Sequence, residues 1–328
     1  MNFVLNGVQE VTKLSNELED GTYKERGRKY FTVTYPKERQ IMSIAFRDRV
    51  YQRSLNDVVI YPVMSKSFIY DNAACQKGKG ADFARERMKR HMEKYYRKFG
   101  PAGYVLKIDI RKYYDSMKHD EVKKIFAKKL PENVYERATK ILDAFPGDTG
   151  FNPGSQIIQI AGISLLDPLD HYIKERLRVK YYSRYMDDMV LIGNDHKQMQ
   201  EWLEAITEKL REIGLEVHPK KTKIIPLREG MLWLGYHYRL TGTGKVVMTV
   251  DPKRVQAARK KYYRLVKKAK RGEISREKVD QSYQCWRTHV SKGDGWRMLK
   301  NMDEYYQGLW KDGDADGNAE DCTQVVAP

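Results

Sequence analysis

The sequence contains little cysteine and no long apolar segment. Its three cysteines, Cys75, Cys285 and Cys322, lie too far apart for the spacing of a zinc site or a disulfide framework. No run of about 18 apolar residues is present, which excludes a membrane-spanning helix. The N-terminal residues show no basic segment followed by an apolar one, so we predict no secretory signal and expect a cytoplasmic protein.

Basic residues are abundant. The 328-residue chain carries 61 Lys and Arg against 44 Asp and Glu, a formal net charge of +17. A surplus of this size favours a polyanionic partner, and nucleic acid is expected ahead of an anionic membrane surface. The length is sufficient for about two or three modules around a large core.

Hydrophobic periodicity predicts a mixture of strands and helices. A strand pair is expected over residues 29–46 around a turn at Pro36, a strand over 103–110 and a hairpin over 180–193. Helices are expected over residues 46–64, 83–99, 119–130, 156–177 and 198–213. We expect the following apolar residues of the first two helices to face the core: Phe46, Val50, Leu55, Val58, Phe83, Met88, Met92, Tyr95 and Phe99. Arg85 and the other basic residues of the second helix are expected to face outward.

Residues 252–272 carry ten basic residues and no acidic one. Apolar residues recur there at helical spacing, which predicts an amphipathic helix with a positive outer face. So many like charges repel one another unless a polyanion lies nearby. The expected nucleic-acid contacts on this helix are Arg259, Lys260, Arg264, Lys267 and Lys268. The acidic, Gly-rich residues 311–328 are expected to be disordered.

Two adjacent carboxylates, Asp187 and Asp188, lie in the middle of the predicted hairpin RYMDDMVLIG. Such a pair is more often a surface turn, but here apolar half-strands flank it on both sides. Two close carboxylates repel each other, and divalent cations relieve that repulsion. Asp109, at the end of the predicted strand 103–110, would supply a third carboxylate for a two-metal Mg²⁺ site.

An ordered series of segments over roughly residues 30–245 resembles the reverse transcriptases. They include YPKERQIMSIAFRDRVYQRSL, FIYDNAACQKGKGADFA, YVLKIDIRKYYDSM, RYMDD, GLEVHPKKTKI and LWLGY. The resemblance implies an α+β, right-hand polymerase with an antiparallel palm sheet. We expect fingers over 1–100, a palm over 101–250 with interleaved finger elements near 120–155, and a basic helical thumb over 251–310. The compact size is similar to the prokaryotic members of the family.

The resemblance also implies roles for individual residues. Asp109, Asp187 and Asp188 would hold two Mg²⁺ ions, for which Mn²⁺ can substitute, and the carbonyl of Ile110 would complete one coordination sphere. Tyr114 would be the aromatic gate that excludes a 2′-hydroxyl, and either it or Tyr113 is structural. Residues implied to contact the nucleotide, its triphosphate or the templating base are Lys37, Arg39, Gln159 and Lys221, with Lys220 as the alternative to Lys221.

Nucleic-acid contacts are implied for the basic residues of the two finger motifs, Arg47, Arg49, Lys77 and Lys79. Arg47 and Arg49 could instead pair with Asp48. The chain departs from the family pattern at Gln76, where the family has Arg, and at Ile158, where some subgroups have Ser. These departures leave the subgroup open among diversity-generating, retron, group II intron-like and phage-defence enzymes.

Three functions remain open from the sequence. The first is an RNA-directed DNA polymerase, with template RNA, a primer and deoxynucleotides as partners. A dedicated non-coding RNA and an accessory protein are further expected partners, and a membrane is not. The second is retron-type or phage-defence DNA synthesis with an unusual template or priming. The third is an RNA-binding, maturase-like protein without the chemistry, against which the complete set of three aspartates argues.

Overall fold

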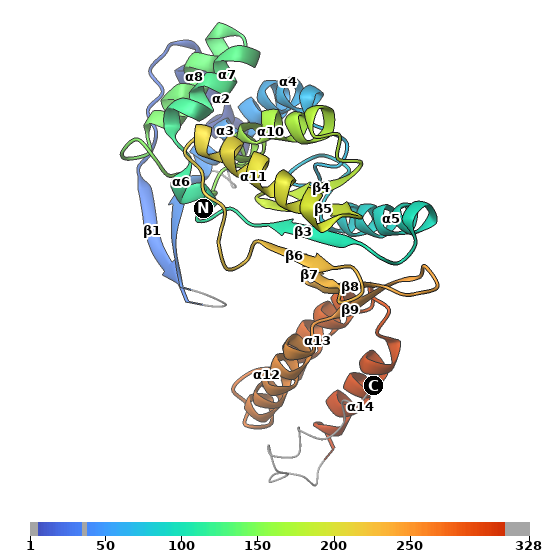
Figure 1. Ribbon diagram of the computed structural model, residues 1–328. Coiled ribbons are helices and arrows are strands. Elements are labelled where there is room, and N and C mark those ends of the chain that lie inside the picture. The colour runs from blue at the N-terminus through green and yellow to red at the C-terminus, as the bar shows by residue number, and fades with distance from the viewer. Residues whose placement is uncertain (1–5, 35–37, 312–328) are drawn as a thin grey trace. The chain divides into compact units, whose positions relative to one another are not determined.

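The chain divides into two compact units, Met1–Pro226 and Leu227–Pro328. Figure 1 shows the computed structural model, which describes residues 6–34 and 38–311. The predicted acidic tail lies outside the described residues from residue 312 onward. Within the described ranges, no helix is both long and apolar enough to cross a membrane.

The main sheet of the first unit is antiparallel throughout, with strand order β4–β5–β3–β6. A separate antiparallel ribbon is formed by β1 and β2, and it confirms the strand pair predicted around Pro36. The hairpin predicted over 180–193 is also confirmed, as β4 and β5. The strand bounds are β1 (Arg28–Val33), β2 (Arg39–Ile44), β3 (Tyr104–Ile108), β4 (Tyr181–Tyr185), β5 (Asp188–Gly193) and β6 (Lys223–Pro226).

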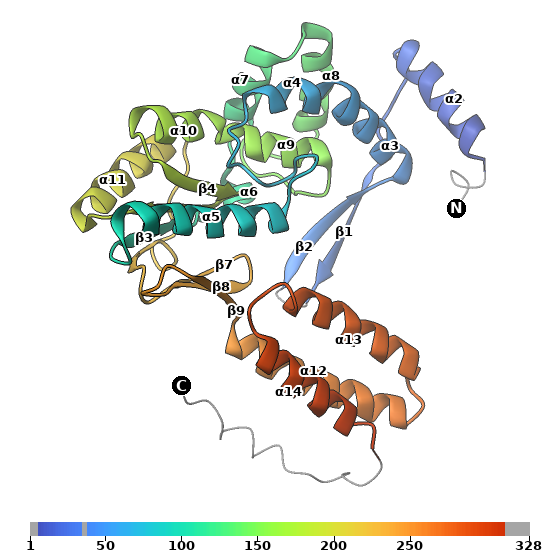
Figure 2. The same ribbon diagram turned by 90° about the vertical axis from the view of Figure 1, so that its right-hand side faces the viewer.

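Helices α5 and α11 lie against this sheet (Figure 2). α5 packs against β4 and β5, whereas α11 packs against β3, β5 and β6. Helices of the first unit are α2 (Gly7–Glu19), α4 (Tyr61–Met64), the 3₁₀-helix η2 (Ser65–Ser67), α5 (Ala81–Phe99), α6 (Tyr113–Ser116), α7 (His119–Lys129), α8 (Glu132–Asp143) and α11 (His196–Glu212), together with those whose bounds follow in the next paragraphs.

α9 (Gln156–Leu165) is the central helix of the first unit. Eight of its ten residues are buried, so it is apolar on all sides, as expected for a helix enclosed by other elements. The Ser155 side chain caps its N-terminus by accepting a hydrogen bond from the Ile158 backbone N–H. α3, α4 and α7 all pack against it. This burial fixes the position of the residues on α9 that lie near the site.

The single helix predicted over 156–177 is wrong, because the chain forms three short helices there. α9 ends at Leu165, α10 (Asp167–His171) follows, and the π-helix η3 (Tyr172–Arg176) completes the segment. Pro168 lies in the first turn of α10. Proline has no backbone N–H and its ring collides with the preceding turn, so a continuous helix cannot pass through it.

The helix predicted from Phe46 onward forms, but half of its predicted inner face is wrong. α3 (Phe46–Leu55) continues into the π-helix η1 (Asn56–Ile60). Val50 and Leu55 pack against the core as expected. Phe46 and Val58, however, are 49% and 70% exposed. The residues that α3 buries instead are Arg47, Asp48, Tyr51 and Gln52.

Polar pairing explains the buried face of α3. Asp48 accepts hydrogen bonds from the Tyr23 hydroxyl at 2.8 Å and from the Arg26 backbone N–H at 2.9 Å. Arg47 forms an ion pair with Glu17 of α2. Charged groups tolerate burial when they are paired, and these partners come from segments that are distant in sequence. Apolar periodicity within one helix cannot reveal them.

In α5, too, the burial of some side chains differs from the prediction. Met88, Met92 and Tyr95 are buried as predicted, but Arg85 is only 7% exposed and pairs with Asp82. The prediction that Arg85 faces outward is therefore wrong. Phe99, predicted to face the core, is 39% exposed at the last position of the helix.

Up to residue 311, the second unit combines a small sheet with three helices. Its sheet is antiparallel in the order β7–β8–β9. The helix predicted over residues 252–272 is confirmed as α12. The element bounds are β7 (Met231–Trp233), β8 (Tyr236–Leu240), β9 (Val246–Val250), α12 (Pro252–Lys270), α13 (Arg276–Val290) and α14 (Trp296–Gly308).

Tyrosines dominate the core of this helical part. Tyr283 of α13 stacks on Tyr306 of α14, with ring centroids 3.8 Å apart. Tyr262 of α12 meets both rings edge-on and is fully buried. Arg287 and Asp303 join α13 and α14 through a bidentate ion pair with N–O distances of 2.9 and 3.0 Å. These contacts hold the three helices together.

We expect Tyr262→Ala to lower the free energy of unfolding of this unit by about 3–5 kcal/mol, because it removes a fully buried ring at the junction of three helices. Tyr263→Ala is the matched control, since that side chain is 37% exposed, and we expect a loss below about 1 kcal/mol. Urea unfolding followed by tryptophan fluorescence measures both, because four of the five tryptophans lie in this unit. Equal losses for the two variants would contradict this account of the core.

Candidate active site

The hairpin between β4 and β5 turns at Met186 and Asp187. Tyr185 pairs with Asp188 across the hairpin, so a two-residue loop connects the strands. Met186 adopts a left-handed backbone conformation, with φ of +55°. This conformation is unfavourable for a residue other than glycine, and such strain is typical of functional sites. The turn presents Asp187 and Asp188 at the end of the sheet, as predicted.

β3 brings the third carboxylate to the same place. Ile108 pairs with Met189 of β5, so Asp109, the next residue, lies at the end of the sheet that carries Asp188. The Asp109 backbone carbonyl accepts a hydrogen bond from the His218 N–H at 2.7 Å. Ile110 follows, is buried, and pairs with Val217. The structure thus gathers the three predicted aspartates at one end of the central strands.

Two lysines lie against these carboxylates. Lys221 Nζ is 2.9 and 3.1 Å from the two carboxylate oxygens of Asp109. Lys107 Nζ is 3.4 Å from Oδ1 of Asp188. The sequence left Lys220 and Lys221 as alternatives, and it is Lys221 that reaches the carboxylates. Lys107 was not among the predicted site residues, although the two-residue period of a strand places it on the same face as Asp109.

Burial and charge repulsion shift the acidity of the pair. The pKa of Asp187 is raised to about 6, first by burial and then by the negative charges of Asp188 and Asp109. Burial also raises the pKa of Asp188, and the positive charge of Lys107 partly offsets the shift. Like charges enclosed together favour protonation unless cations neutralise them. The site therefore carries a negative charge that two ammonium groups only partly balance.

The donor set suits a hard cation. Mg²⁺ prefers oxygen ligands, and three carboxylates lie at this end of the strands. Oδ1 of Asp188 is buried and accepts no hydrogen bond of ordinary geometry. Within residues 6–34 and 38–311, no three His, Cys, Asp or Glu side chains surround one metal-sized point. Mg²⁺ in polymerase-type sites usually takes one or two carboxylates and completes its shell with water and substrate phosphates, so the residues fit such an ion.

Tyr113 and Tyr114 have different environments. Both lie in the short helix α6, which follows β3. Tyr113 is buried and its hydroxyl donates to the Gly162 carbonyl of α9. Tyr114 packs its ring on Gly162, where an added Cβ would lie only 3.1–3.3 Å from the ring, and its hydroxyl has no hydrogen-bond partner. Tyr113 is thus enclosed in the core, whereas Tyr114, the residue predicted as the gate, is partly exposed beside it.

Three predicted site residues line one pocket of about 260 Å³. Gln159 lies on α9, and Lys77 and Lys79 lie in the loop before α5. Asn56 and Gln156 also line it, and each has a buried side-chain oxygen without a hydrogen-bond partner. Cys75 connects the pocket to the hairpin turn, since its sulfur lies 3.6 Å from Gln159 Oε1 and 3.8 Å from Met186 Sδ. The pocket is rich in amides and carries positive charge.

The remaining predicted finger residues are not gathered at this site. Arg47 is 3% exposed and pairs with Glu17, with Asp48 Oδ1 at 4.0 Å, so the pairing alternative describes it rather than a phosphate contact. Arg49 is exposed and lies over the Phe46 ring. Lys37 lies outside the described residues, and only the backbone of Arg39, in β2, is described.

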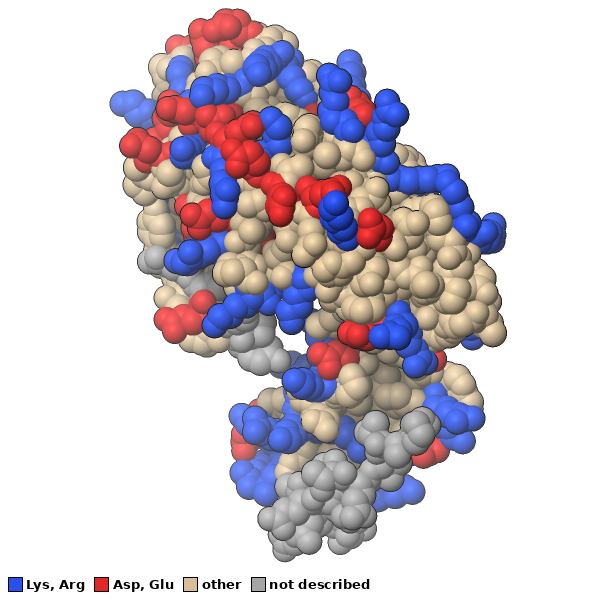
Figure 3. Space-filling view, viewed as in Figure 1, with Lys and Arg blue, Asp and Glu red and all other residues tan. Residues whose placement is uncertain are grey.

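α12 carries the predicted basic surface of the second unit. Lys260, Arg264, Lys267 and Lys268 are exposed, whereas Arg259 is half-buried with its guanidinium over the Tyr305 ring. Lys268 has an acidic neighbour, Glu273, at 3.7 Å. Figure 3 shows lysine and arginine side chains over this unit. The helix thus presents its positive face to solvent.

The family model described as "Reverse transcriptase (RNA-dependent DNA polymerase)" matches residues 34–238. No curated protein matches the chain. Among solved structures, the chain is similar to telomerase from Candida albicans in complex with a fragment of telomeric RNA. The identity is 12% and the TM-score 0.53, over 89% of this chain and 61% of the telomerase chain. At that identity the likeness shows the fold alone.

Two further solved structures are similar at lower scores. Telomerase from Candida tropicalis, also with a telomeric RNA fragment, has 15% identity and a TM-score of 0.47, over 92% of this chain and 57% of that one. The Sicinivirus 3Dpol RNA-dependent RNA polymerase has 11% identity and a TM-score of 0.47, over 83% and 58%. The chain spans about 61% of the length of the Candida albicans telomerase it matches.

The predicted α+β, right-hand polymerase fold is confirmed by the antiparallel sheets and by the likeness to telomerase. The assignment to the prokaryotic members of the family stays a prediction, as do the roles of the individual site residues. The family model covers more than half of the chain, including all three aspartates. The chain therefore belongs to the reverse transcriptase family of RNA-dependent DNA polymerases.

Proposed function

We propose that the chain extends the 3′-hydroxyl of a primer with deoxynucleotides, copying an RNA template. The observation that carries this proposal is the meeting of Asp109, Asp187 and Asp188 at one end of the central strands, with Lys221 against Asp109. A protein that only bound RNA would not need three carboxylates there, because they repel phosphates. The intact set therefore favours chemistry over binding alone.

Asp109, Asp187 and Asp188 would hold two Mg²⁺ ions, with Mn²⁺ as a substitute and the carbonyl of Ile110 as a further ligand. When bound, such ions increase the acidity of the primer hydroxyl and neutralise charge on the triphosphate and the leaving pyrophosphate. The protein's own contribution is to keep the carboxylates ionised and together. Lys107 and Lys221 serve this purpose, since each places a positive charge within 3.4 Å of a carboxylate oxygen.

We propose a second role for Lys221 during the reaction. Its side chain is 54% exposed, so it can leave Asp109 and follow a negatively charged phosphate group. A triphosphate would bring such a group to the carboxylates. Lys37 and Arg39 are the other proposed triphosphate contacts, from their positions in the first finger motif.

The pocket lined by Gln159, Lys77 and Lys79 is proposed to contact the template strand. Its amides are suited to the edges of nucleobases, and its lysines to phosphates. The exposed basic face of α12 is proposed to follow the phosphates of the template–primer duplex without reading sequence. Arg49 is a further proposed phosphate contact. The template is proposed to be a dedicated non-coding RNA or an RNA of phage or host.

We expect Asp187→Asn to lower kcat for primer extension by at least about 10³-fold, because the carboxylate is one of the proposed metal ligands. The assay is single-nucleotide addition to a DNA primer on an RNA template. Asp195→Asn is the matched control, since that exposed residue caps α11 and Asn caps equally well. An active Asp187→Asn variant would contradict the proposed function.

The metal-free protein should show Asp187 titrating near pH 6, above the ordinary value for an aspartate, because burial and neighbouring charges favour the protonated form. Asp188→Ala removes one of those charges, so the pKa of Asp187 should fall. Side-chain ¹³C NMR measures the pKa of Asp187 in both proteins across pH 3–8, a range that includes the expected transition. A wild-type titration at the value of a solvated aspartate would contradict the arrangement described for the turn.

We expect Tyr114→Ala to raise the efficiency of ribonucleotide addition relative to deoxynucleotide addition by roughly 10- to 100-fold, because the ring that would collide with a 2′-hydroxyl is gone. Tyr114→Phe should leave the ratio unchanged, since the Tyr114 hydroxyl has no hydrogen-bond partner in the structure. The ratio of kcat/KM for paired nucleotides is the measurement. An unchanged ratio for Tyr114→Ala would remove Tyr114 from the proposed site.

A further inference from the structure

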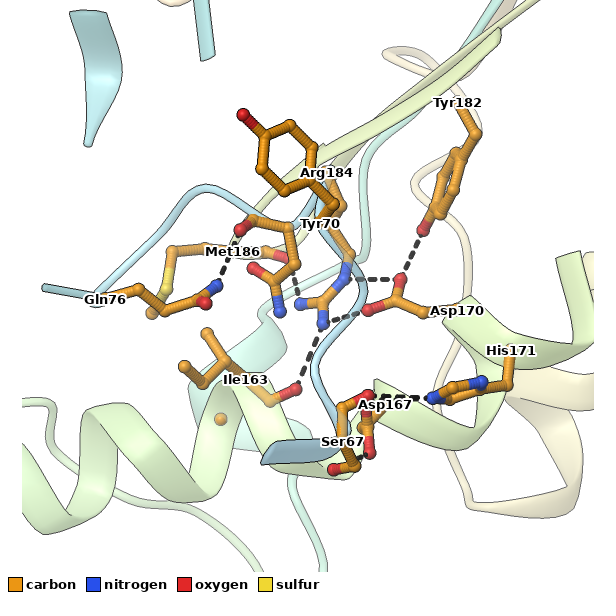
Figure 4. A network of polar contacts seen from close by, with 12 residues as sticks. Ser67, Tyr70, Gln76, Ile163, Asp167, Asp170, His171, Tyr182, Arg184 and Met186 are labelled. Atoms are coloured by element: carbon orange, nitrogen blue, oxygen red, sulfur yellow. Dashed lines mark hydrogen bonds and ion pairs between the residues drawn. The ribbon is translucent and has the colours of Figure 1, made fainter. Parts of the chain in front are cut away.

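A fully buried ion pair lies directly behind the hairpin turn (Figure 4). Arg184 of β4 and Asp170 of α10 are both 0% exposed. The guanidinium donates through Nε to Asp170 Oδ1 at 2.8 Å and through Nη2 to Oδ2 at 2.5 Å. The Tyr182 hydroxyl donates to Oδ1 at 2.6 Å. The two hydrogen bonds to the Asp170 carboxylate therefore hold the Arg184 guanidinium in a fixed plane.

The same guanidinium reaches two backbone carbonyls. Nη1 donates to the Met186 carbonyl at 2.9 Å, inside the left-handed turn that precedes Asp187. Nη2 donates to the Ile163 carbonyl at 3.0 Å. Ile163 lies in the last turn of α9, where carbonyls lack partners within the helix. One side chain thus connects the carboxylate turn to the helix that carries Gln159 and supports Tyr114.

The backbone of Arg184 adds a third connection. Its N–H donates to the Asp71 carbonyl at 3.1 Å, and its carbonyl accepts from the Ala73 N–H at 3.0 Å. Asn72 therefore pairs with Arg184 along the outer side of β4. Gln76, which lines the amide-rich pocket, donates from its side chain to the Asn72 carbonyl. The turn, the central helix and the pocket loop all meet at this residue.

Stability alone gives little reason for a buried ion pair here. Apolar residues of similar volume often stabilise a core as well as a buried pair does. An apolar side chain at position 184 could not donate at all, and the three N–H groups of a lysine, all on one nitrogen, could not make the four hydrogen bonds that the guanidinium spreads over three nitrogens. What only arginine supplies at this position is a rigid fork that fixes the Met186 carbonyl.

We propose that Arg184 is a positioning residue, which acts through the Met186 carbonyl to set the orientation of the Asp187 carboxylate toward the metal ions. This inference rests on the proposed function of that turn. Misplacing a reacting group by about 1 Å lowers rates by roughly 100-fold, and changes just outside a metal's ligands weaken its binding by roughly 10- to 100-fold. Arg184 does not touch the substrate.

The test compares Arg184→Lys with wild type by two readouts. The first is the affinity of the metal-free protein for Mn²⁺ alone, followed by electron paramagnetic resonance. The second is single-nucleotide primer extension, with kcat and the deoxynucleotide KM determined separately. We expect Mn²⁺ affinity to fall by about 10-fold and kcat by about 100-fold, with KM unchanged within about threefold.

Arg287→Lys is the control for loss of a bidentate arginine–carboxylate pair, since Arg287 binds Asp303 in the other unit. It should leave both readouts at wild-type values. Where Arg184→Lys does not fold, as judged by thermal unfolding, Asp170→Asn replaces it. That variant keeps the shape of the side chain and weakens its hold on the guanidinium, so both readouts should change in the same direction by a smaller factor.

An Arg184→Lys variant with wild-type Mn²⁺ affinity and kcat would overturn the inference while leaving the proposed function intact. So would a loss of kcat that matches the loss of folded protein, with Mn²⁺ affinity unchanged, because that is the result of a purely structural role. A wild-type protein that neither binds Mn²⁺ through Asp187 nor extends a primer would overturn both the proposed function and the role of Arg184.

Discussion

The pairing of β3 with β5 is the constraint on which the site depends. It places Ile108 opposite Met189 and so brings Asp109 to the end of the sheet occupied by Asp188. A shift of this register by one residue would turn every side chain of β3 to the opposite face. Leu106 and Ile108 are buried in the core, and such a shift would turn the charged side chain of Lys107 toward that core instead. Apolar packing therefore determines where the carboxylates meet.

Placing the three carboxylates at one end of the sheet has an unfavourable electrostatic free energy. Carboxylates brought together in a partly buried place repel one another, as the raised pKa of Asp187 reflects. Lys107 and Lys221 offset part of the repulsion, one from the strand and one from the segment before β6. The fold thus tolerates the charge without cancelling it.

Much of this could be predicted from the sequence. The hairpin, the ribbon around Pro36, α5, α7, α11 and α12 follow from local periodicity and turn residues. Asp187 and Asp188 stand out because apolar half-strands flank them. The failures on α3 and α5 share one cause, which is that a charged side chain is buried beside an ion-pair partner. Arg47 pairs with Glu17 of α2 and Arg85 with Asp82 of its own helix, and both arginines are buried although a count of apolar residues assigns them to the surface. For residues 156–177, by contrast, a local feature, Pro168, indicates that one continuous helix does not form.

The sequence by itself determined the family, the order of the elements and the identity of the three aspartates, because these depend on residue types in a fixed linear order. It could not determine which lysine meets Asp109, which tyrosine packs on Gly162, or that Arg184 joins the turn to α9. Those facts depend on side-chain distances of a few ångströms between segments far apart along the chain. Such distances exist only once the antiparallel sheet has formed and α9 has been enclosed, so only the tertiary structure decided them.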